Sequence, residues 1–304
     1  MPTFVKWSRL ISIVIFIGIL SFAVYSKDIA ANDLSQAATL SATEVSTPDG
    51  TVSPMPDSTS EVRPELEQYF KEFNVVGSFE LYDLNANHYI RYNPERTVQR
   101  FIPASTFKVF NSLVGLETGV VTDENFVIKW NGTHYPYPEW NRDQTLQSAI
   151  TNSVVWYYQE VARRVGREQM QHYIDLAGYG NQDITGNIDS FWLDGKLRIS
   201  QEEQINLLVR LYKNELPFSQ RTMDIVKKIM ILEKTSTYTL RGKTGFGQRV
   251  TPQVGWFIGY VETKGNIYFF AINIESPIPD EHFTQARLTI NRYILQALNV
   301  LPKN

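Results

Sequence analysis

Ser105 and Lys108 lie three residues apart in the segment "PASTFK", and an apolar stretch follows them. A serine hydroxyl becomes a useful nucleophile only when a neighbouring base takes its proton. If a helix begins here, residues i and i+3 share a face, so the Lys108 amine can reach the Ser105 hydroxyl near the positive end of the helix. The pair therefore predicts acyl transfer through serine. The alternative is a serine N-cap followed by a solvated lysine, although Lys108 begins the most apolar helix of the folded part.

A second candidate segment is "RGKTGFG", which places Lys243 and Thr244 at the end of an expected strand. Gly-Lys-Thr also ends phosphate-binding loops, but such a loop needs a glycine where this chain has Thr237, and it opens a helix. The nucleotide interpretation fails on both counts. Taken singly, Ser153 in "ITNSVVWYYQE" indicates a buried hydroxyl bonded to a backbone carbonyl, and "YGN" at 179–181 indicates only a turn.

The order of these segments is more informative than any one of them. With "STFK", "SVV", "YGN" and "KTG" in this order, the sequence resembles the penicillin-recognising serine enzymes, specifically the class D β-lactamases, or oxacillinases. "SFWLDG" is a further mark of that class, and Ser-Val-Val stands where class A enzymes have Ser-Asp-Asn. The resemblance spans about residues 63–301 and implies hydrolysis of small-molecule β-lactam antibiotics.

The resemblance also implies roles for individual residues. Ser105 would attack the lactam carbonyl, and Ser153 would pass a proton to the departing nitrogen. The oxyanion would be held by the backbone N–H groups of Ser105 and Phe246. The implied substrate-binding residues, which include those for the substrate carboxylate, are Lys243, Thr244, Gly245, Arg287 and Tyr179.

The apolar surroundings of Lys108 bear on its protonation. Desolvation disfavours the ammonium form and can lower a lysine pKa by several units. In class D enzymes the neutral amine takes up carbon dioxide, so the resemblance implies a carbamate on Lys108 that serves as general base for acylation and deacylation. A buried anion needs donors. The residues expected to support the carbamate are Trp192, Val155, Phe107 and Leu193.

Two other functions share most of these motifs. A penicillin sensor domain is acylated in the same way but does not turn over, and a cell-wall DD-peptidase also carries Ser-x-x-Lys and Lys-Thr-Gly. The peptidase usually shows Ser-x-Asn where this chain has Val155, and it has no need of the Trp192 motif. A class A mechanism would use a glutamate, but Glu202 and Glu203 lie in a helix-start pattern. The hydrolase is therefore preferred.

Composition excludes several other classes. The 29 basic and 32 acidic residues give a net charge of −3, and no basic stretch is interleaved with aromatics, so nucleic acid is not an expected partner. The chain has no cysteine, which excludes disulfides and thiolate sites. Its four histidines show no metal-ligand spacing, so we expect no metal and no other cofactor. No stable protein partner is expected, while a homodimer stays open.

The N-terminal region predicts export. Lys6 and Arg9 precede an apolar stretch over 10–24, which is typical of a signal peptide and short for a membrane span. We expect residues 1–26 to be a signal peptide or an uncleaved anchor, and the protein to be periplasmic or secreted, or membrane-tethered if the anchor stays. Residues 27–62 are rich in small and polar types and predict a disordered linker. The catalytic domain is then 63–304.

The elements that must position these residues follow from local patterns. Near 63–73 a short helix is expected after Pro64, and "GSFELYDLNANHYIRYN" predicts a hairpin that turns at 85–87. Helices are predicted over 105–119, 145–165, 168–177, 200–213, 219–232 and 281–298, and strands over 237–244, 254–261 and 267–274.

Strands at both ends of the folded part, with helices between them, predict an α+β class. We expect the β-lactamase/transpeptidase-like fold, in which a central antiparallel sheet is flanked by terminal helices and an all-helical subdomain is inserted. The cleft between the subdomains would hold the site. The segment "NGTHYPYPEW", with His134, Tyr135, Tyr137 and Trp140, either borders that cleft or simply packs.

Overall fold

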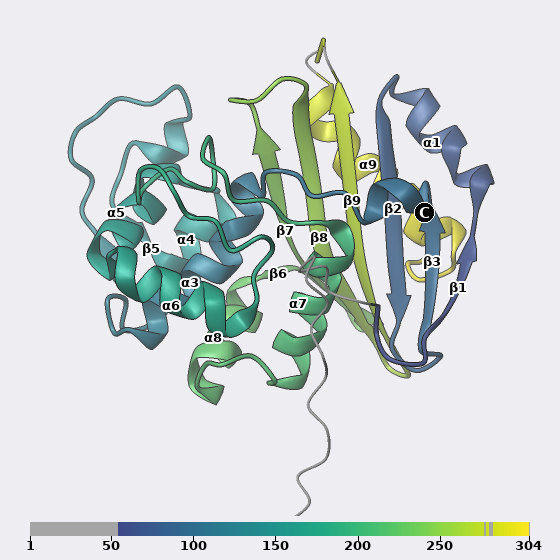
Figure 1. Cartoon of the computed structure of the whole chain (residues 1–304), viewed down its shortest axis with the longest axis horizontal. Helices are drawn as coiled ribbons and strands as arrows, with labels where there is room; N and C mark the ends of the chain where they lie inside the picture. Colours follow the sequence, from purple (N-terminus) through teal and green to yellow (C-terminus); the bar gives the residue numbers. More distant parts are fainter. Residues whose placement is uncertain (1–53, 277, 280–281, 304) are drawn as a thin grey trace, which may run out of the picture. The chain divides into compact units, whose positions relative to one another are not determined.

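The computed structural model describes residues 54–276, 278–279 and 282–303. Over these residues its main sheet has the strand order β1-β3-β2-β9-β8-β7-β6 (Figure 1). Neighbouring strands are antiparallel except β1 and β3, which are parallel. The strands are β1 (Thr59–Val62), β2 (Val76–Asp83), β3 (His88–Tyr92), β6 (Ile231–Lys234), β7 (Tyr238–Gly247), β8 (Gln253–Thr263) and β9 (Ile267–Ser276).

Most helices lie between β3 and β6 in the chain, and those labelled α3, α4, α5, α6 and α8 form a cluster on one side of the sheet in Figure 1. Near the ends of the folded part are η1 (Pro64–Leu66), α1 (Glu67–Glu72) and α9 (Phe283–Ala297). Between them lie α2 (Pro94–Thr97), η2 (Ala104–Thr106), α3 (Phe107–Glu117), η3 (Pro138–Trp140), α4 (Leu146–Thr151), α5 (Val155–Val165), α6 (Arg167–Ala177), α7 (Gln201–Lys213) and α8 (Gln220–Ile229). A short pair, β4 (Val127–Ile128) and β5 (Gln144–Thr145), lies within this part. The predicted α+β fold is confirmed.

The sheet separates two hydrophobic cores because side chains alternate along a strand. In β8, Trp256 and Ile258 belong to the core shared with the inserted helices, whereas Phe257 and Val261 belong to the core beneath α1 and α9. Burial on both faces explains why the central strands carry long apolar runs. The sheet therefore packs against the inserted helices on one face and against α1 and α9 on the other.

The start of α7 confirms the capping-box prediction. The Ser200 hydroxyl accepts the Glu203 backbone N–H at 3.1 Å, and the Glu203 carboxylate accepts the Ser200 N–H at 2.8 Å. Glu203 also pairs with Arg100. These contacts assign Glu203 to helix capping and an ion pair.

Two predicted helices are wrong in extent. The single helix predicted over 145–165 is instead α4 and α5, with a break at 152–154. The helix predicted to run to residue 232 ends at Ile229, and Leu232 lies in β6. In the second case pairing with β7 at the sheet edge outweighs local helix propensity, which is a weak preference.

The N-terminal boundary of the folded part also differs from the prediction. Thr59–Val62, assigned to the end of the linker, forms β1 along β3, with Thr59 N–H donating to the Asn87 carbonyl at 3.1 Å. The residues of β1 are exposed, so this strand is held by backbone hydrogen bonds that composition does not reveal. The folded part therefore begins at or before Thr59, earlier than the predicted boundary at residue 63. The predicted signal peptide and residues 27–53 lie outside the described residues.

Within the described part of the chain, no helix combines the length and the apolar character that a membrane crossing requires.

Candidate active site

Ser105 lies in η2, directly after a sharp backbone turn at Ala104. The φ angle of Ala104 is +48°, a left-handed conformation that residues with a Cβ rarely adopt and that is enriched at functional sites. The Ala104 N–H donates to the Trp192 carbonyl at 3.0 Å, which ties this turn to the "SFWLDG" segment. Lys108, in the first turn of α3, lies with Nζ 2.6 Å from Ser105 Oγ. The predicted contact between residues i and i+3 is confirmed.

Lys108 is fully buried. Residues 107–116 of α3 are all buried, so the helix lies within the core and Lys108 is buried as part of it. Burial, aided by the nearby charge of Lys243, holds the pKa of Lys108 well below its ordinary value. A neutral amine can accept a proton from Ser105, which an ammonium cannot do. The solvated-lysine alternative is therefore wrong.

Ser153 occupies the turn that ends α4. The Val154 N–H donates to the Ala149 carbonyl at 2.9 Å, and the Ser153 N–H donates to the Ile150 carbonyl at 3.3 Å. These two bonds define a Schellman motif, whose residue after the cap must be left-handed and is usually glycine. Here that residue is Ser153, with φ +53°. The turn aims its hydroxyl at Lys243, whose Nζ lies 3.1 Å from Ser153 Oγ.

Strand β7 brings the Lys-Thr-Gly segment against η2. A Cβ on Gly245 would lie 3.0 Å from the Pro103 carbonyl oxygen and 3.1 Å from Thr106 Cγ2. A side chain at this position would be crowded by the serine turn, so glycine favours the close approach of β7. The next residue, Phe246, lines the same cavity as Ser105.

A cavity of about 290 Å³ joins these elements. The predicted site residues that line it are Ser105, Ser153, Val155, Thr244, Gly245, Phe246 and Arg287. It thus draws on η2, on the turn between α4 and α5, on β7 and on the first turns of α9. This is the cleft that the fold prediction expects between the subdomains.

The cavity is prepared for an anion. Arg287 is 8% exposed, and its Nε and Nη1 have no hydrogen-bond partner among the described residues. Burial lowers the pKa of Arg287 to about 10, and burial together with the charge of Arg287 lowers the pKa of Lys243 to about 7. Neither side chain has a carboxylate partner among the described residues, and burying an unpaired charge is costly. Arg287 lines the cavity, so a ligand carboxylate there could offset its charge, whereas Lys243 lies behind the lining and contacts Ser153.

Three of the predicted supporting residues lie beside the serine turn and are buried. Trp192 and Phe107 are each 0% exposed, and their rings stack with centroids 5.4 Å apart. Leu193 belongs to the same core. The indole Nε1 of Trp192 is buried and has no acceptor among the described residues, so a donor is left free in this core. Val155 differs from these three because it lines the cavity itself.

The prediction that Tyr179 binds substrate is corrected by the structure. Tyr179 is 2% exposed and does not line the cavity. Its ring contacts Phe107 and Phe110, with centroids 5.4 Å and 4.8 Å away, and burial raises the pKa of its hydroxyl. The motif "YGN" therefore packs behind α3, and its tyrosine supports the core rather than the ligand.

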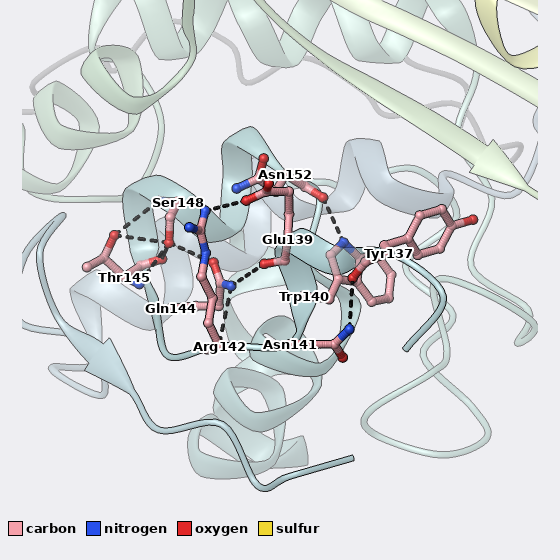
Figure 2. Close-up of polar contacts among 9 residues, drawn as sticks. All are labelled: Tyr137, Glu139, Trp140, Asn141, Arg142, Gln144, Thr145, Ser148 and Asn152. Atoms are coloured by element: carbon pink, nitrogen blue, oxygen red, sulfur yellow. Dashed lines mark hydrogen bonds and ion pairs between the residues drawn. The ribbon is translucent and has the colours of Figure 1, made fainter. Parts of the chain in front are cut away.

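The segment "NGTHYPYPEW" fits either a cleft border or core packing by sequence, and the structure places part of it at the cavity. Tyr137 and Trp140 line the cavity, as do Asn152, Gln248 and Thr284. Figure 2 shows the loop, in which the Gln144 amide donates to the Glu139 carbonyl at 2.7 Å. The only sequence feature that pointed to a site here was the number of aromatic residues in the segment, and that feature is equally typical of core packing. Among the described residues no cluster of histidine and carboxylate side chains could hold a metal ion.

A family model described as the penicillin binding protein transpeptidase domain matches residues 73–296. The sheet, the inserted helices and the buried Ser-Lys pair thus define a serine enzyme of the penicillin-binding type.

More specific relatives narrow the family. The chain is 42% identical to β-lactamase OXA-48 of Klebsiella pneumoniae over 234 residues, which cover 77% of this chain and 88% of that protein. It is similar in structure to the class D β-lactamase YbXI from Nostoc, with a TM-score of 0.75 and 46% identity over 78% of this chain and 99% of that chain. The chain belongs to the class D serine β-lactamase family.

One relative bears on the sensor alternative. The regulatory protein BlaR1 of Bacillus licheniformis is 42% identical over 212 residues, which cover 69% of this chain but 35% of BlaR1. The match is therefore to one part of that longer protein.

Proposed function

We propose that this chain hydrolyses β-lactam antibiotics by forming, and then hydrolysing, an acyl-enzyme at Ser105. One observation carries the proposal: the buried Lys108 amine lies 2.6 Å from the Ser105 hydroxyl, which itself opens onto the cavity. A base at this distance can activate the nucleophile. The similarity to OXA-48 and to the Nostoc protein, both β-lactamases, supports the substrate class.

In the proposed acylation, Ser105 Oγ attacks the lactam carbonyl and its proton passes to the Lys108 side chain. The backbone N–H groups of Ser105 and Phe246 hold the oxyanion, and removing one such donor typically costs about 3 kcal/mol of barrier. As the C–N bond breaks, the lactam nitrogen takes a proton from Ser153. Lys243, 3.1 Å from Ser153 Oγ, can return that proton.

The substrate carboxylate is proposed to bind at the cationic side of the cavity. The unpartnered guanidinium of Arg287 and the Thr244 hydroxyl would hold it, with Lys243 supplying a second charge. Gly245 contributes by letting the strand approach the serine turn. A planar guanidinium matches a carboxylate in a bidentate pair, which favours Arg287 as the principal anchor.

We further propose that Lys108 is carboxylated. The residues fit a carbamate because the amine is buried with a pKa well below its ordinary value, and because the buried indole N–H of Trp192 has no acceptor among the described residues. When present, the carbamate supplies an anionic oxygen that can take a proton from Ser105 and later from water. Phe107, Leu193 and Val155 keep the surroundings apolar.

The test is turnover of a chromogenic cephalosporin, with and without bicarbonate, followed by intact mass of the protein. We expect many turnovers per molecule, stimulated by bicarbonate, and no adduct once substrate is consumed. Ser105→Ala should form no covalent adduct with a penicillin. An adduct on that variant would refute the assignment of the nucleophile.

A penicillin sensor is the second candidate, favoured by the similarity to BlaR1. It predicts one stoichiometric burst and a stable Ser105 adduct even with bicarbonate present. A DD-peptidase would instead release D-alanine from a cell-wall peptide, which the same preparation can be tested for.

We also propose that the protein is exported. Lys6, Arg9 and the apolar stretch over 10–24 support an N-terminal signal. Fractionation of cells that express the full chain tests this, since retention of all activity in the cytoplasm would contradict it.

A further inference from the structure

Trp140 lines the cavity, and its indole also forms a hydrogen bond with the backbone beside Ser153. Its indole Nε1 donates to the Asn152 carbonyl at 3.0 Å, as Figure 2 shows. Asn152 caps the C-terminal end of α4, where the last carbonyl groups have no partner within the helix. The residue that follows is Ser153. The indole therefore holds the peptide unit that joins the cap to the proposed proton donor.

A second tryptophan fixes the first. The indole Nε1 of Trp156, in the first turn of α5, donates to the Trp140 carbonyl at 2.9 Å. Trp156 is 8% exposed, so this anchor belongs to the core. The Trp140 ring also contacts Tyr137 and Tyr135, with centroids 4.9 Å and 5.5 Å away. The chain of contacts thus begins in α5, passes through η3 and returns to the end of α4.

The contact acts on a turn that needs support. Ser153 has φ +53°, a conformation that costs a residue with a Cβ free energy and persists only when its surroundings fix it. Backbone hydrogen bonds hold the N–H groups of Ser153 and Val154, but among the contacts that the structure describes the Asn152 carbonyl is held by the indole alone. A shift of that peptide unit would move Ser153 Oγ away from Lys243, 3.1 Å from it.

We propose that Trp140 is a positioning residue for acylation: its indole N–H fixes the Asn152 carbonyl and thereby the Ser153 hydroxyl. This inference rests on the proposed function, because it assigns Ser153 the proton transfer to the lactam nitrogen. The proposal gives the Trp140 ring and the Trp140 indole N–H different roles. The Trp140 ring forms a wall for any ligand, whereas its N–H acts on the reaction through Ser153 and makes no contact with substrate.

The test is a double-mutant cycle measured by single-turnover acylation of Ser105 by a penicillin. Trp140→Phe keeps an aromatic wall and removes the donor. We expect its acylation rate constant to fall about tenfold, as expected for one lost hydrogen bond to a strained turn, with the dissociation constant of the noncovalent complex changed less than twofold. In a Ser153→Ala background the same substitution should change acylation less than twofold, because the group it positions is gone.

A matched control lies in the same loop. The Trp130 indole Nε1 donates to the Thr133 carbonyl at 2.8 Å, away from the cavity lining. Trp130→Phe also removes a hydrogen bond from an indole to a backbone carbonyl, here an exposed one, and should acylate at the wild-type rate. If Trp140→Phe fails to fold by circular dichroism, 3-benzothienylalanine at position 140 keeps the bicyclic ring, lacks the N–H and carries the same expectation.

The outcomes separate this inference from the proposed function. Wild-type protein that forms no Ser105 adduct would sink the proposed function. Normal wild-type acylation, together with an unchanged rate in the Trp140 variant, would overturn the positioning role alone. An equal loss with and without the Ser153 hydroxyl would also overturn it, since the indole would then act through the wall or the fold.

Discussion

The left-handed conformation of Ser153 should lower the free energy of unfolding, and this loss of stability can be measured. A left-handed residue with a Cβ is less favourable by about 1–2 kcal/mol, a penalty that glycine escapes. Glycine loses more backbone entropy on folding, which offsets about 0.5–1 kcal/mol of this gain. Both Ser153→Gly and Ser153→Ala lose the hydroxyl bonded to Lys243. The glycine variant should therefore be more stable than the alanine variant by about 0.5–1 kcal/mol.

The assay is denaturant unfolding of both variants, with thermal unfolding as a check. For a domain of this size, 1 kcal/mol corresponds to about 2–4 °C in Tm, so the glycine variant should melt about 2 °C higher. Both variants should acylate slowly, because neither can protonate the lactam nitrogen. The serine would then be retained for its hydroxyl against the preference of the backbone.

Asn299 supplies a matched control at the end of α9. Its φ is +58°, and the Val300 N–H donates to the Leu295 carbonyl at 2.8 Å, which is the same helix-ending geometry. Asn299→Gly should likewise exceed Asn299→Ala in stability, with activity unchanged. Equal stability of the two Ser153 variants, alongside a clear difference at Asn299, would refute the strain argument for the active-site turn.

Four further predictions concern charges and donors. Lys108→Ala should acylate at best and then stall, and repeated turnover of that variant would contradict its role. Trp192→Phe should lose activity that bicarbonate partly restores; wild-type activity without bicarbonate would count against the donor role. Because the pKa of Lys243 is about 7, the KM for an anionic penicillin should rise above pH 7 as Lys243 loses its charge. Arg287→Ala should raise KM and should also shift this rise to higher pH, because the Arg287 charge no longer lowers the Lys243 pKa. If the rise in KM stays at the same pH, the two charges are not coupled. Burial raises the pKa of Glu80 from 4.5 to about 7, so the unfolded state releases its proton first and stability should fall by on the order of 3 kcal/mol between pH 4.5 and 7. Glu80→Gln should weaken that fall in denaturant unfolding, and an identical pH profile would refute the assignment.

The sequence predicts those parts of the fold that local patterns determine. The hairpin of β2 and β3, the three C-terminal strands and the capped start of α7 follow from periodicity, turn residues and a capping box, and all are confirmed. The elements that were wrong depend on distant partners. β6 forms because β7 offers it an edge, and β1 forms because β3 does.

The candidate site shows the same division. The contact between Ser105 and Lys108 was predictable because both lie on one helical turn. The break before α5 was not, because serine has no special preference for a left-handed position and the sequence has no glycine there. Tyr179 was misplaced because a motif reveals that a residue matters without revealing which way it faces. The role of Trp140 is not predictable from the sequence, because its indole bonds to a carbonyl twelve residues away and the conformation of the intervening loop follows no local pattern.

The pairing of β2 with β9 has a consequence for how the chain folds. Val76 lies opposite Glu275, so the sheet joins residues 199 positions apart in sequence (275 − 76). High contact order slows folding, because the entropy of closing a long loop is lost before the contact forms. The N-terminal hairpin therefore keeps an open edge until nearly the whole chain is available. Folding should be a late, cooperative event that the C-terminal strands complete, and a chain that ends before β9 should expose β2 as an edge for association with other chains.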